Sequence, residues 1–260
     1  MRKRRTRIGV LAIVACAAGA SLAHAELTAR GDLFVKFNGG IAPNALPRHA
    51  RAPISVSVSG TVKTLSGERP PALREIAIAI NSGGELNAHG LPICRRSQLE
   101  ATSSEQARAS CGRALVGEGR YLANTAFPEQ LAFPANGKIL AFNAIVDGRE
   151  AILAHVYGTK PLPITRIIVF RIRRTGGTYG TTLTGFLPAS VNHYGYVRRI
   201  SLTLHREFVY RGQRRSYLSA ACTAPTGFTG GLFSFARASM TFADGRKLSS
   251  TLTRSCKVRG

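Results

Sequence analysis

Acidic residues are scarce in this sequence. The 260 residues include 13 Asp and Glu against 36 Lys and Arg, which gives a formal net charge of +23. A glycosidase-type mechanism needs two carboxyl groups that face one cleft. Asp147 and Asp244 each precede a glycine and are explained as turn residues, while Glu100 and Glu105 suit the surface of a helix. The remaining candidates are scattered and stand in no recognisable motif: Asp32, Glu75, Glu118, Glu150 and Glu207.

Motifs of catalytic and metal sites are missing as well. The chain contains no His-Glu-x-x-His, no Gly-x-Ser-x-Gly and no Ser-x-x-Lys sequence. Its cysteines are too far apart for a zinc site, and none forms Cys-x-x-Cys. We therefore predict a protein that is not an enzyme and uses no cofactor or metal. A secreted hydrolase whose triad is assembled from distant segments stays as the alternative, because serines and histidines are numerous.

Long apolar stretches are confined to the N-terminus. Residues 1–7 are strongly basic, an apolar stretch follows, and Ala23-His24-Ala25 has the small-x-small pattern of a signal-peptidase site. This predicts a signal peptide over residues 1–25, cleaved after Ala25, and a secreted or cell-surface protein. A lipoprotein anchored through Cys16 is the alternative, although the residues after Cys16 remain apolar. No later stretch reaches the ~20 residues of a membrane span, so we expect no integral span in the mature chain.

The cysteines of the mature chain are even in number. Removal of the signal leaves Cys94, Cys111, Cys222 and Cys256. In the oxidising environment of an exported protein such cysteines pair as disulfides. Three connectivities are open, and proximity favours Cys94–Cys111 and Cys222–Cys256. On a loop-entropy model these bonds contribute about 3 and about 4 kcal/mol, respectively.

The net charge stays high after export. Loss of the five basic residues of the signal lowers the formal charge from +23 to +18. A protein this basic attracts polyanions, so an anionic wall polymer or an envelope protein is the expected partner, and nucleic acid is not. However, 29 arginines against 7 lysines, spread along the chain, are also typical of a GC-rich genome. The charge can therefore be compositional, and both interpretations stay open.

Alternating apolar and polar residues dominate the mature chain. In "PISVSVSGTVKT", Ile54, Val56 and Val58 fall on one face of a strand, and the intervening serines fall on the other. Asp147-Gly148 and Asp244-Gly245 mark tight hairpin turns. About eleven such segments predict an all-β fold, a single antiparallel β-sandwich. We expect an N-terminal segment over residues 26–50 and one domain over 51–260.

One short helix is expected among these strands. It covers residues 98–110, begins after a capping Ser97, and carries few apolar side chains. Cys94 and Cys111 bracket it. We expect the Cys94–Cys111 bridge to staple this helix onto the β scaffold, because a short polar helix is marginal alone.

A mixed aromatic and basic cluster is the best candidate for a binding surface. Such side chains can stack on sugars or bases while they pair with anionic groups. The segment "VNHYGYVRR" can equally be a loop that enters a strand, with Tyr196 packed in the core. The candidate binding residues are His193, Tyr194, Tyr196, Arg198 and Arg199, together with Arg171 and Arg173 on a strand face.

Several short motifs carry a resemblance. "GLPIC", "ALVGEG", "YGTTL", "SYLSAAC" and the terminal "LTRSCKV" resemble a group of exported β-rich proteins of GC-rich Gram-positive bacteria, for which no activity is established. The resemblance spans about residues 51–258. It implies export and a single folding unit, and it implies no site. We therefore expect a non-catalytic protein of the cell envelope or extracellular space that binds an anionic polymer or a partner protein weakly through its basic surface.

Overall fold

The alternation of apolar and polar residues does produce β structure. The structure of the protein is a computed structural model that describes residues 26–188 and 195–259. Strands make up 62% of it and helices 6%, which confirms the predicted all-β class. The predicted signal peptide with Cys16, and the candidate residues His193 and Tyr194, lie outside the described residues.

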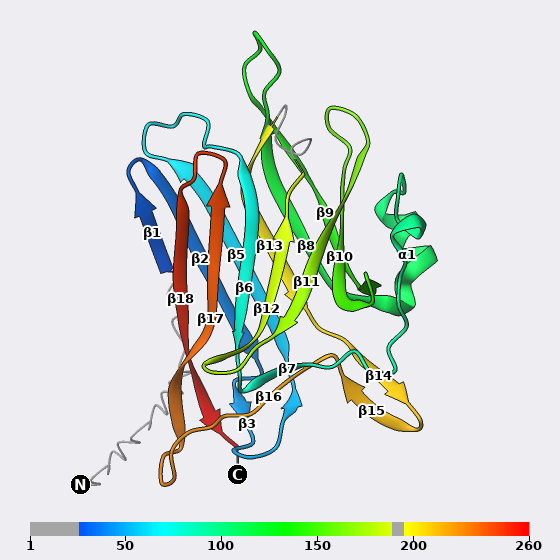
Figure 1. The fold of residues 1–260 in the computed structure, drawn as a ribbon, viewed down its shortest axis with the longest axis vertical. Coiled ribbons are helices and arrows are strands. Elements are labelled where there is room, and N and C mark those ends of the chain that lie inside the picture. Colours follow the sequence, from blue (N-terminus) through cyan, green and yellow to red (C-terminus); the bar gives the residue numbers. More distant parts are fainter. Residues whose placement is uncertain (1–25, 189–194, 260) are drawn as a thin grey trace, which may run out of the picture.

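The elements are mostly strands, which range from 2 to 14 residues in length, and most of the connections between them are short (Figure 1). In chain order they are β1 (Glu26–Arg30), β2 (Leu33–Ala42), β3 (Ala45–Leu46), β4 (Ala52–Pro53), β5 (Ser55–Thr64), β6 (Leu73–Asn81), β7 (Gly84–Leu86), the 3₁₀ turn η1 (Arg96–Gln98), α1 (Ser104–Cys111), the 3₁₀ turn η2 (Gly112–Ala114), β8 (Leu115–Thr125), β9 (Phe133–Val146), β10 (Arg149–Gly158), β11 (Ile164–Arg174), β12 (Tyr179–Phe186), β13 (Gly195–Leu204), β14 (Glu207–Tyr210), β15 (Gln213–Ser216), β16 (Leu218–Ala220), β17 (Gly230–Phe242) and β18 (Lys247–Val258).

Thirteen of these strands form one continuous sheet that curls into a half-barrel. Its order is β1-β2-β5-β13-β8-β9-β10-β11-β12-β6-β17-β18-β3, and every pair is antiparallel except β18 with β3. The prediction of a β-sandwich with about eleven strands is therefore wrong in both strand number and arrangement. Pairing between segments far apart in sequence, β13 with β5 and β6 with β12 and β17, joins the expected layers into a single sheet.

The tight turns follow the sequence closely. Asp147 and Gly148 both have positive φ, 51° and 71°, which is the geometry of a type I′ hairpin between β9 and β10. Gly245, with φ of 82°, lies in the turn between β17 and β18. Residues 26–50, the predicted N-terminal segment of the mature chain, supply β1, β2 and β3 to the main sheet.

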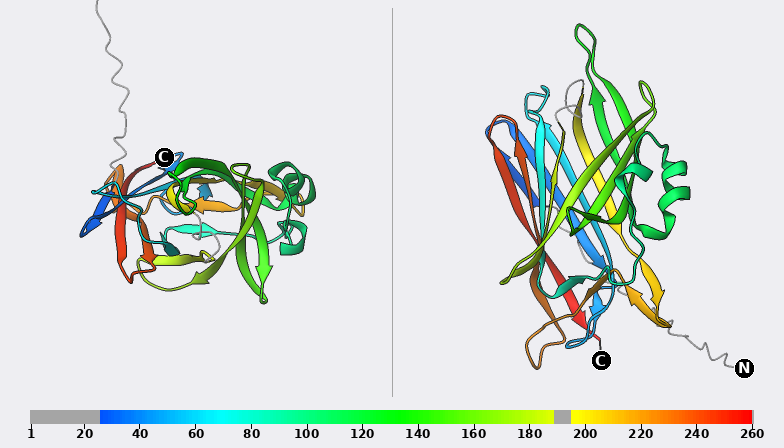
Figure 2. Two further views of the ribbon diagram at one scale, coloured as in Figure 1. Left: turned by 90° about the horizontal axis from the view of Figure 1, so that it is seen from above. Right: turned by 45° about the vertical axis from the view of Figure 1, so that its right-hand side comes forward.

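Side chains hold the two ends of the curled sheet together. Thr28 Oγ1 on β1 donates to the carbonyl oxygen of Ser249 on β18 at 3.1 Å. Arg246, beside the β17–β18 turn, forms an ion pair with Asp32 at 2.7 Å. Seen from above, β1 and β18 lie next to each other at one side of the molecule (Figure 2). The sheet therefore wraps around an interior.

One half of that interior is filled. Large apolar side chains from β2, β17 and β18 meet there and are almost fully buried. They include Leu33, Val35, Phe37, Met240, Phe242, Leu248 and Leu252, with exposed fractions of at most 4%. This packed half lies between β2 and β18 (Figure 1), and burial of these side chains supplies much of the hydrophobic stabilisation of the sheet.

A small sheet closes the lower end of the half-barrel. It has the order β4-β16-β7 and carries the buried side chains of Leu86 and Leu218, next to a fully buried Tyr217. Cys222, which follows β16, forms a disulfide with Cys256 of β18. The bridge thus ties this small sheet to the main sheet.

The segment with α1 covers the outer face of β9 and β10 (Figure 2). Leu99 and Ala107 are fully buried there, in one cluster with Phe142 of β9 and with the Cys94–Cys111 disulfide. The predicted staple is therefore present. Both disulfides have the pairing that proximity favoured.

The helix itself is shorter than the sequence indicated. The predicted start, with Ser97 as the cap, is wrong, because the chain forms the 3₁₀ turn η1 there and α1 begins only at Ser104. Ser103 is the actual cap. Its hydroxyl accepts from the backbone N–H of Gln106 at 3.2 Å, and the Gln106 side chain accepts from the Ser103 N–H at 2.8 Å. This reciprocal capping box outweighs the single serine at position 97.

Candidate functional site

Small side chains leave the second half of the interior hollow. Along β8, β9 and β10, Gly117 pairs with Ala141, and Ala141 pairs with Ala154. These cross-strand neighbours point to the same side of the sheet, which is the interior. Ile168 of β11 continues the row. At the level of this row, β8, β9 and β10 therefore offer only glycine and alanine, whereas the other half of the interior has leucine, phenylalanine and methionine.

The result is a cavity of about 530 Å³. This volume lies within the range of about 300–1,000 Å³ that small-molecule sites occupy. The lining is mainly aliphatic and comes from nine strands of the main sheet. It includes Val56, Val58, Ile76, Ile78, Ile80, Ile139, Ile152, Ile168, Leu183, Leu202, Leu204 and Phe235.

Tyr121 projects into this cavity over two paired glycines. In register, Tyr121 of β8 faces Gly137 of β9, and Gly137 faces Gly158 of β10. A Cβ atom at Gly137 would lie 2.5 Å from the ring carbon Cε1 of Tyr121, and one at Gly158 would overlap the Tyr121 hydroxyl. The glycines are therefore required for this ring position. Burial raises the pKa of Tyr121, so its hydroxyl is neutral and can donate a hydrogen bond.

A few other polar groups reach the lining. Asn124 Nδ2 donates to the Tyr196 hydroxyl at 2.7 Å, while Asn124 Oδ1 is buried without a hydrogen-bond partner. The charged side chains among the described lining residues are Lys160 and Arg166, and none is acidic. The cavity lining is thus mainly apolar, and the charged side chains that it contains are positive.

The cavity reaches the surface at one end of the half-barrel. Residues 160–163 of the connection between β10 and β11, and Ile164 at the start of β11, both line the cavity and are exposed to solvent. The exposed fraction of Leu162 is 73%, and that of Leu131 in the β8–β9 connection is 94%. Both connections lie at the upper end in Figure 1. A ligand therefore has an apolar entrance at this end.

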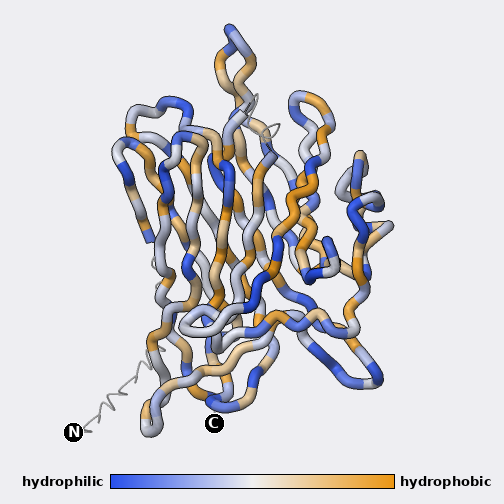
Figure 3. Tube along the Cα trace, viewed as in Figure 1, coloured by the Kyte–Doolittle hydropathy of each residue, from blue (hydrophilic) through white to orange (hydrophobic). Residues whose placement is uncertain are grey.

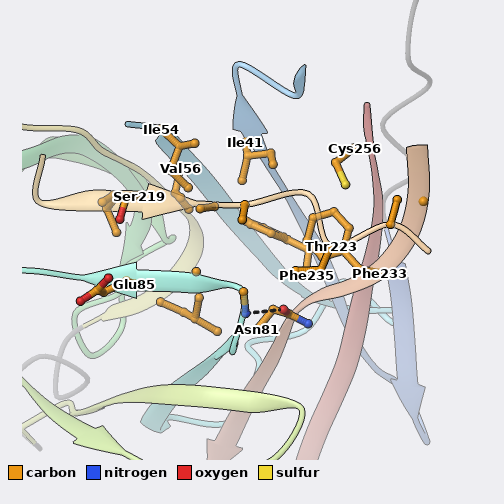
Figure 4. Close-up of a pocket in the computed structure, with 18 of the residues that line it drawn as sticks. Ile41, Ile54, Val56, Asn81, Glu85, Ser219, Thr223, Phe233, Phe235 and Cys256 are labelled. Carbon is orange, nitrogen blue, oxygen red and sulfur yellow. Dashed lines mark hydrogen bonds between the residues drawn. The ribbon is translucent and has the colours of Figure 1, made fainter. Parts of the chain in front are cut away.

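A second pocket lies near the lower end (Figure 4). It is lined by residues of β6, β7, β16 and β17, and Asn81 in it accepts from the backbone N–H of Gly83 at 2.8 Å. Its volume is only about 70 Å³. It shares Val56, Ile80 and Phe235 with the large cavity, so we treat it as the lower end of the same interior.

The predicted binding residues are not brought together. Tyr196 lines the cavity, whereas Arg198 and Arg199 are exposed on β13. Arg171 and Arg173 are exposed on β11, and β8, β9 and β10 lie between these strands in the sheet. The hydropathy view shows β11 as apolar through its middle and hydrophilic near its upper end and at its lower, arginine-rich end (Figure 3).

Groups for catalysis do not collect in the cavity. Its described lining contains no histidine, cysteine, serine or acidic residue. Over residues 26–188 and 195–259, no three His, Cys, Asp or Glu residues are grouped as a metal site would require. His155 is fully buried but lies on β10 under the α1 segment, where its Nε2 is 3.1 Å from Thr102 Oγ1. Desolvation lowers the pKa of His155, which keeps this packed ring neutral.

The fold and the cavity define a class: a disulfide-bonded, all-β half-barrel with an apolar interior that opens at one end. Comparison of the chain with protein-family models, with curated proteins and with solved structures gives no match. The two disulfides indicate an oxidising, extracellular environment. None of the helices in the described part of the chain has the length and apolar character to cross a membrane.

Proposed function

We propose that the protein is an exported, non-catalytic binding protein that holds an apolar ligand in its interior cavity. The observation that carries this proposal is the cavity of about 530 Å³, walled by aliphatic side chains and connected to solvent at one end. A cavity of this size and lining is the usual form of a small-molecule site.

The physical argument concerns the water that an unliganded cavity holds. Water needs two to four polar partners to be stable in a cavity, and the long aliphatic walls of this one offer few. A hydrocarbon ligand would release that water and gain about 25 cal/mol for each Å² of apolar surface that it buries. The two disulfides and the densely packed half of the interior keep the walls in place, so little binding energy is lost in ordering the protein.

Binding of an anionic wall polymer through the basic surface stays a prediction. Several arginines are engaged in ion pairs with acids on different elements, such as Arg51 with Glu85 and Arg108 with Glu118. The candidate basic residues lie on separate strands, β13 and β11. The cavity is the more specific feature, and for this reason we place it first.

The test is a fluorescence titration with N-phenyl-1-naphthylamine, a neutral apolar probe. The sequence has no tryptophan, so the protein background is low. We expect saturable binding with one probe per chain. In the variant Ala141→Phe the new ring would occupy the cavity, and we expect the affinity to fall by about tenfold or more, a loss of ~1.4 kcal/mol. The matched control Ala29→Phe adds the same ring to an exposed position of β1 and should bind as wild type.

Thermal unfolding of the same variants shows whether a loss of probe binding comes from a filled cavity or from a destabilised protein. Overpacking of a filled core costs about 1–3 kcal/mol, whereas Ala141→Phe should fill empty space and leave the unfolding midpoint unchanged or raised. Ala154→Phe offers a second position on the same cavity wall. The proposal is wrong if wild type shows no saturable binding, or if the cavity variants fold and bind the probe as well as Ala29→Phe does.

A further inference from the structure

Arg166 gives the cavity a preference for ligands that carry a negative charge. Resting on the proposed function, we infer that the ligand is an amphiphile with an anionic head group, which Arg166 binds near the entrance while the hydrocarbon chain extends into the apolar interior. A carboxylate, a phosphate and a sulfate share this chemistry, because the planar guanidinium donates two parallel hydrogen bonds to any of them.

The position of Arg166 is fixed by the register of β11. Its neighbours at alternate positions, Ile164 and Ile168, line the cavity as Arg166 does. Arg166 pairs with Val156 of β10, which also lines the cavity. The side chain is half-buried, and it lies one interior position below Ile164 at the entrance.

The guanidinium of Arg166 lacks an acidic partner. Its Nη1 donates to the carbonyl oxygen of Thr165 at 3.0 Å, and its Nε is buried without a partner. On the same strand, Arg171 pairs with Asp147 at 3.0 Å and Arg174 pairs with Glu150 at 2.8 Å. Over the described chain, none of the ion pairs involves Arg166.

This arrangement is unfavourable without a ligand. A buried donor without an acceptor loses hydrogen bonds to water and gains none. Lys160 at the entrance adds a second positive charge, and the described lining has no carboxylate to offset either one. An anionic head group would satisfy Arg166 and gain from the low dielectric constant of its surroundings.

The same geometry orients the ligand. A head group at Arg166 directs the chain away from the entrance, past Ala154 and Ala141, towards Leu204 and Phe235 in the deeper part of the cavity. The small residues of β9 and β10 then provide the space for the chain. Arg166 and the alanine wall thus serve the two ends of one molecule.

The test compares head groups on one chain length. Dodecanoate, dodecyl phosphate, dodecanol and dodecyltrimethylammonium, each below its micelle concentration, are titrated into wild type by calorimetry. We expect both anions to bind on the order of tenfold tighter than dodecanol, since a hydrogen bond to a charged group adds that much. The cation should bind most weakly. The ratio of the two anions shows whether a carboxylate or a phosphate fits better.

The decisive variant is Arg166→Gln, with Arg173→Gln as its control. Arg173 belongs to the same strand but is exposed at its lower end, so this variant matches the loss of net charge. In Arg166→Gln we expect the preference for anions over dodecanol to disappear, while the affinity for dodecanol changes by less than about twofold. Arg173→Gln should keep the preference.

The outcomes separate the two proposals. If wild type binds dodecanol as tightly as dodecanoate, or if Arg166→Gln keeps the anion preference, the head-group inference is overturned and the cavity proposal stands. Equal loss of the preference in Arg173→Gln would also overturn it, because general charge would then be the cause. If neither the anions nor dodecanol bind wild type, the proposed function itself fails.

Discussion

Replacement of Phe142 by alanine is expected to lower the free energy of unfolding by about 3–5 kcal/mol, as for other large buried aromatic side chains. Phe142 is fully buried on the outer face of β9, in one cluster with Leu99, Ala107 and Leu153. Its ring fills the contact between the main sheet and the α1 segment, and the disulfide nearby limits how far that segment can collapse onto the space left behind. Denaturant unfolding followed by circular dichroism would measure the change.

The matched control is Phe186→Ala. Phe186 ends β12 with an exposed fraction of 59%, so its loss should change the free energy of unfolding by no more than about 0.5 kcal/mol. If Phe142→Ala were as mild as this control, the α1 segment would not be packed on β9 in the way described. The cluster on the outer face would then have to be revised.

The second large effect is expected from the Cys222–Cys256 disulfide. Replacement of both cysteines by alanine should cost about 4 kcal/mol, since the bond closes a loop across a sequence separation of 34 residues. Both side chains are buried, and the bond joins the end of the small sheet to β18. The measurement is the free energy of unfolding of the double variant in denaturant.

The other disulfide provides the comparison. The double variant of Cys94 and Cys111 should lose about 3 kcal/mol, because its sequence separation is 17 residues. Its loss should also expose residues 97–110 to protease, whereas loss of Cys222–Cys256 should loosen the foot of the half-barrel. A Cys222 and Cys256 double variant as stable as wild type would contradict the closing role of the small sheet.

The local features of the fold could be predicted from the sequence. Asp147-Gly148 specified its hairpin because glycine and aspartate accept positive φ where most residues do not. The predicted export to an oxidising environment and the spacing of the cysteines together favoured the two disulfides that the structure contains. The main sheet is different, since the pairing of β13 with β5 joins residues more than a hundred positions apart. No local sequence pattern specifies a pairing partner this far away in the chain. A β-sandwich and a curled sheet also have the same alternation of apolar and polar residues, so this alternation does not distinguish them.

The cavity could not be predicted from the sequence for a related reason. Ala141 and Ala154 stand on two different strands and become one wall only when the register is known. A signal was nevertheless present in "KILAFNAIV" and "AILAHVY", which are continuous apolar runs rather than alternating ones. Such runs indicate a strand that is buried on both faces. In β9 and β10 one face packs under α1 and the other faces the cavity.

The candidate surface of aromatic and basic residues was chosen by adjacency in sequence. Tyr196 and Arg198 are close in the chain, yet Tyr196 lines the cavity while Arg198 is exposed. Arg166, which has the more informative surroundings, stands among apolar residues in the sequence, and no motif there marks it as a binding residue. Arg166 is a candidate for ligand binding because its guanidinium group has no acidic partner, and only the three-dimensional arrangement shows this.

The proposed function requires that the curled sheet hold a hydrocarbon chain in its interior. The most direct measurement is a crystal structure of the protein grown with a fatty acid that carries bromine on its terminal carbon, with the bromine located by anomalous scattering. We predict a single bromine peak deep in the cavity, near Leu204 and Phe235. A cavity filled with ordered water, with the bromine only on the outer surface or absent, would overturn the proposed function.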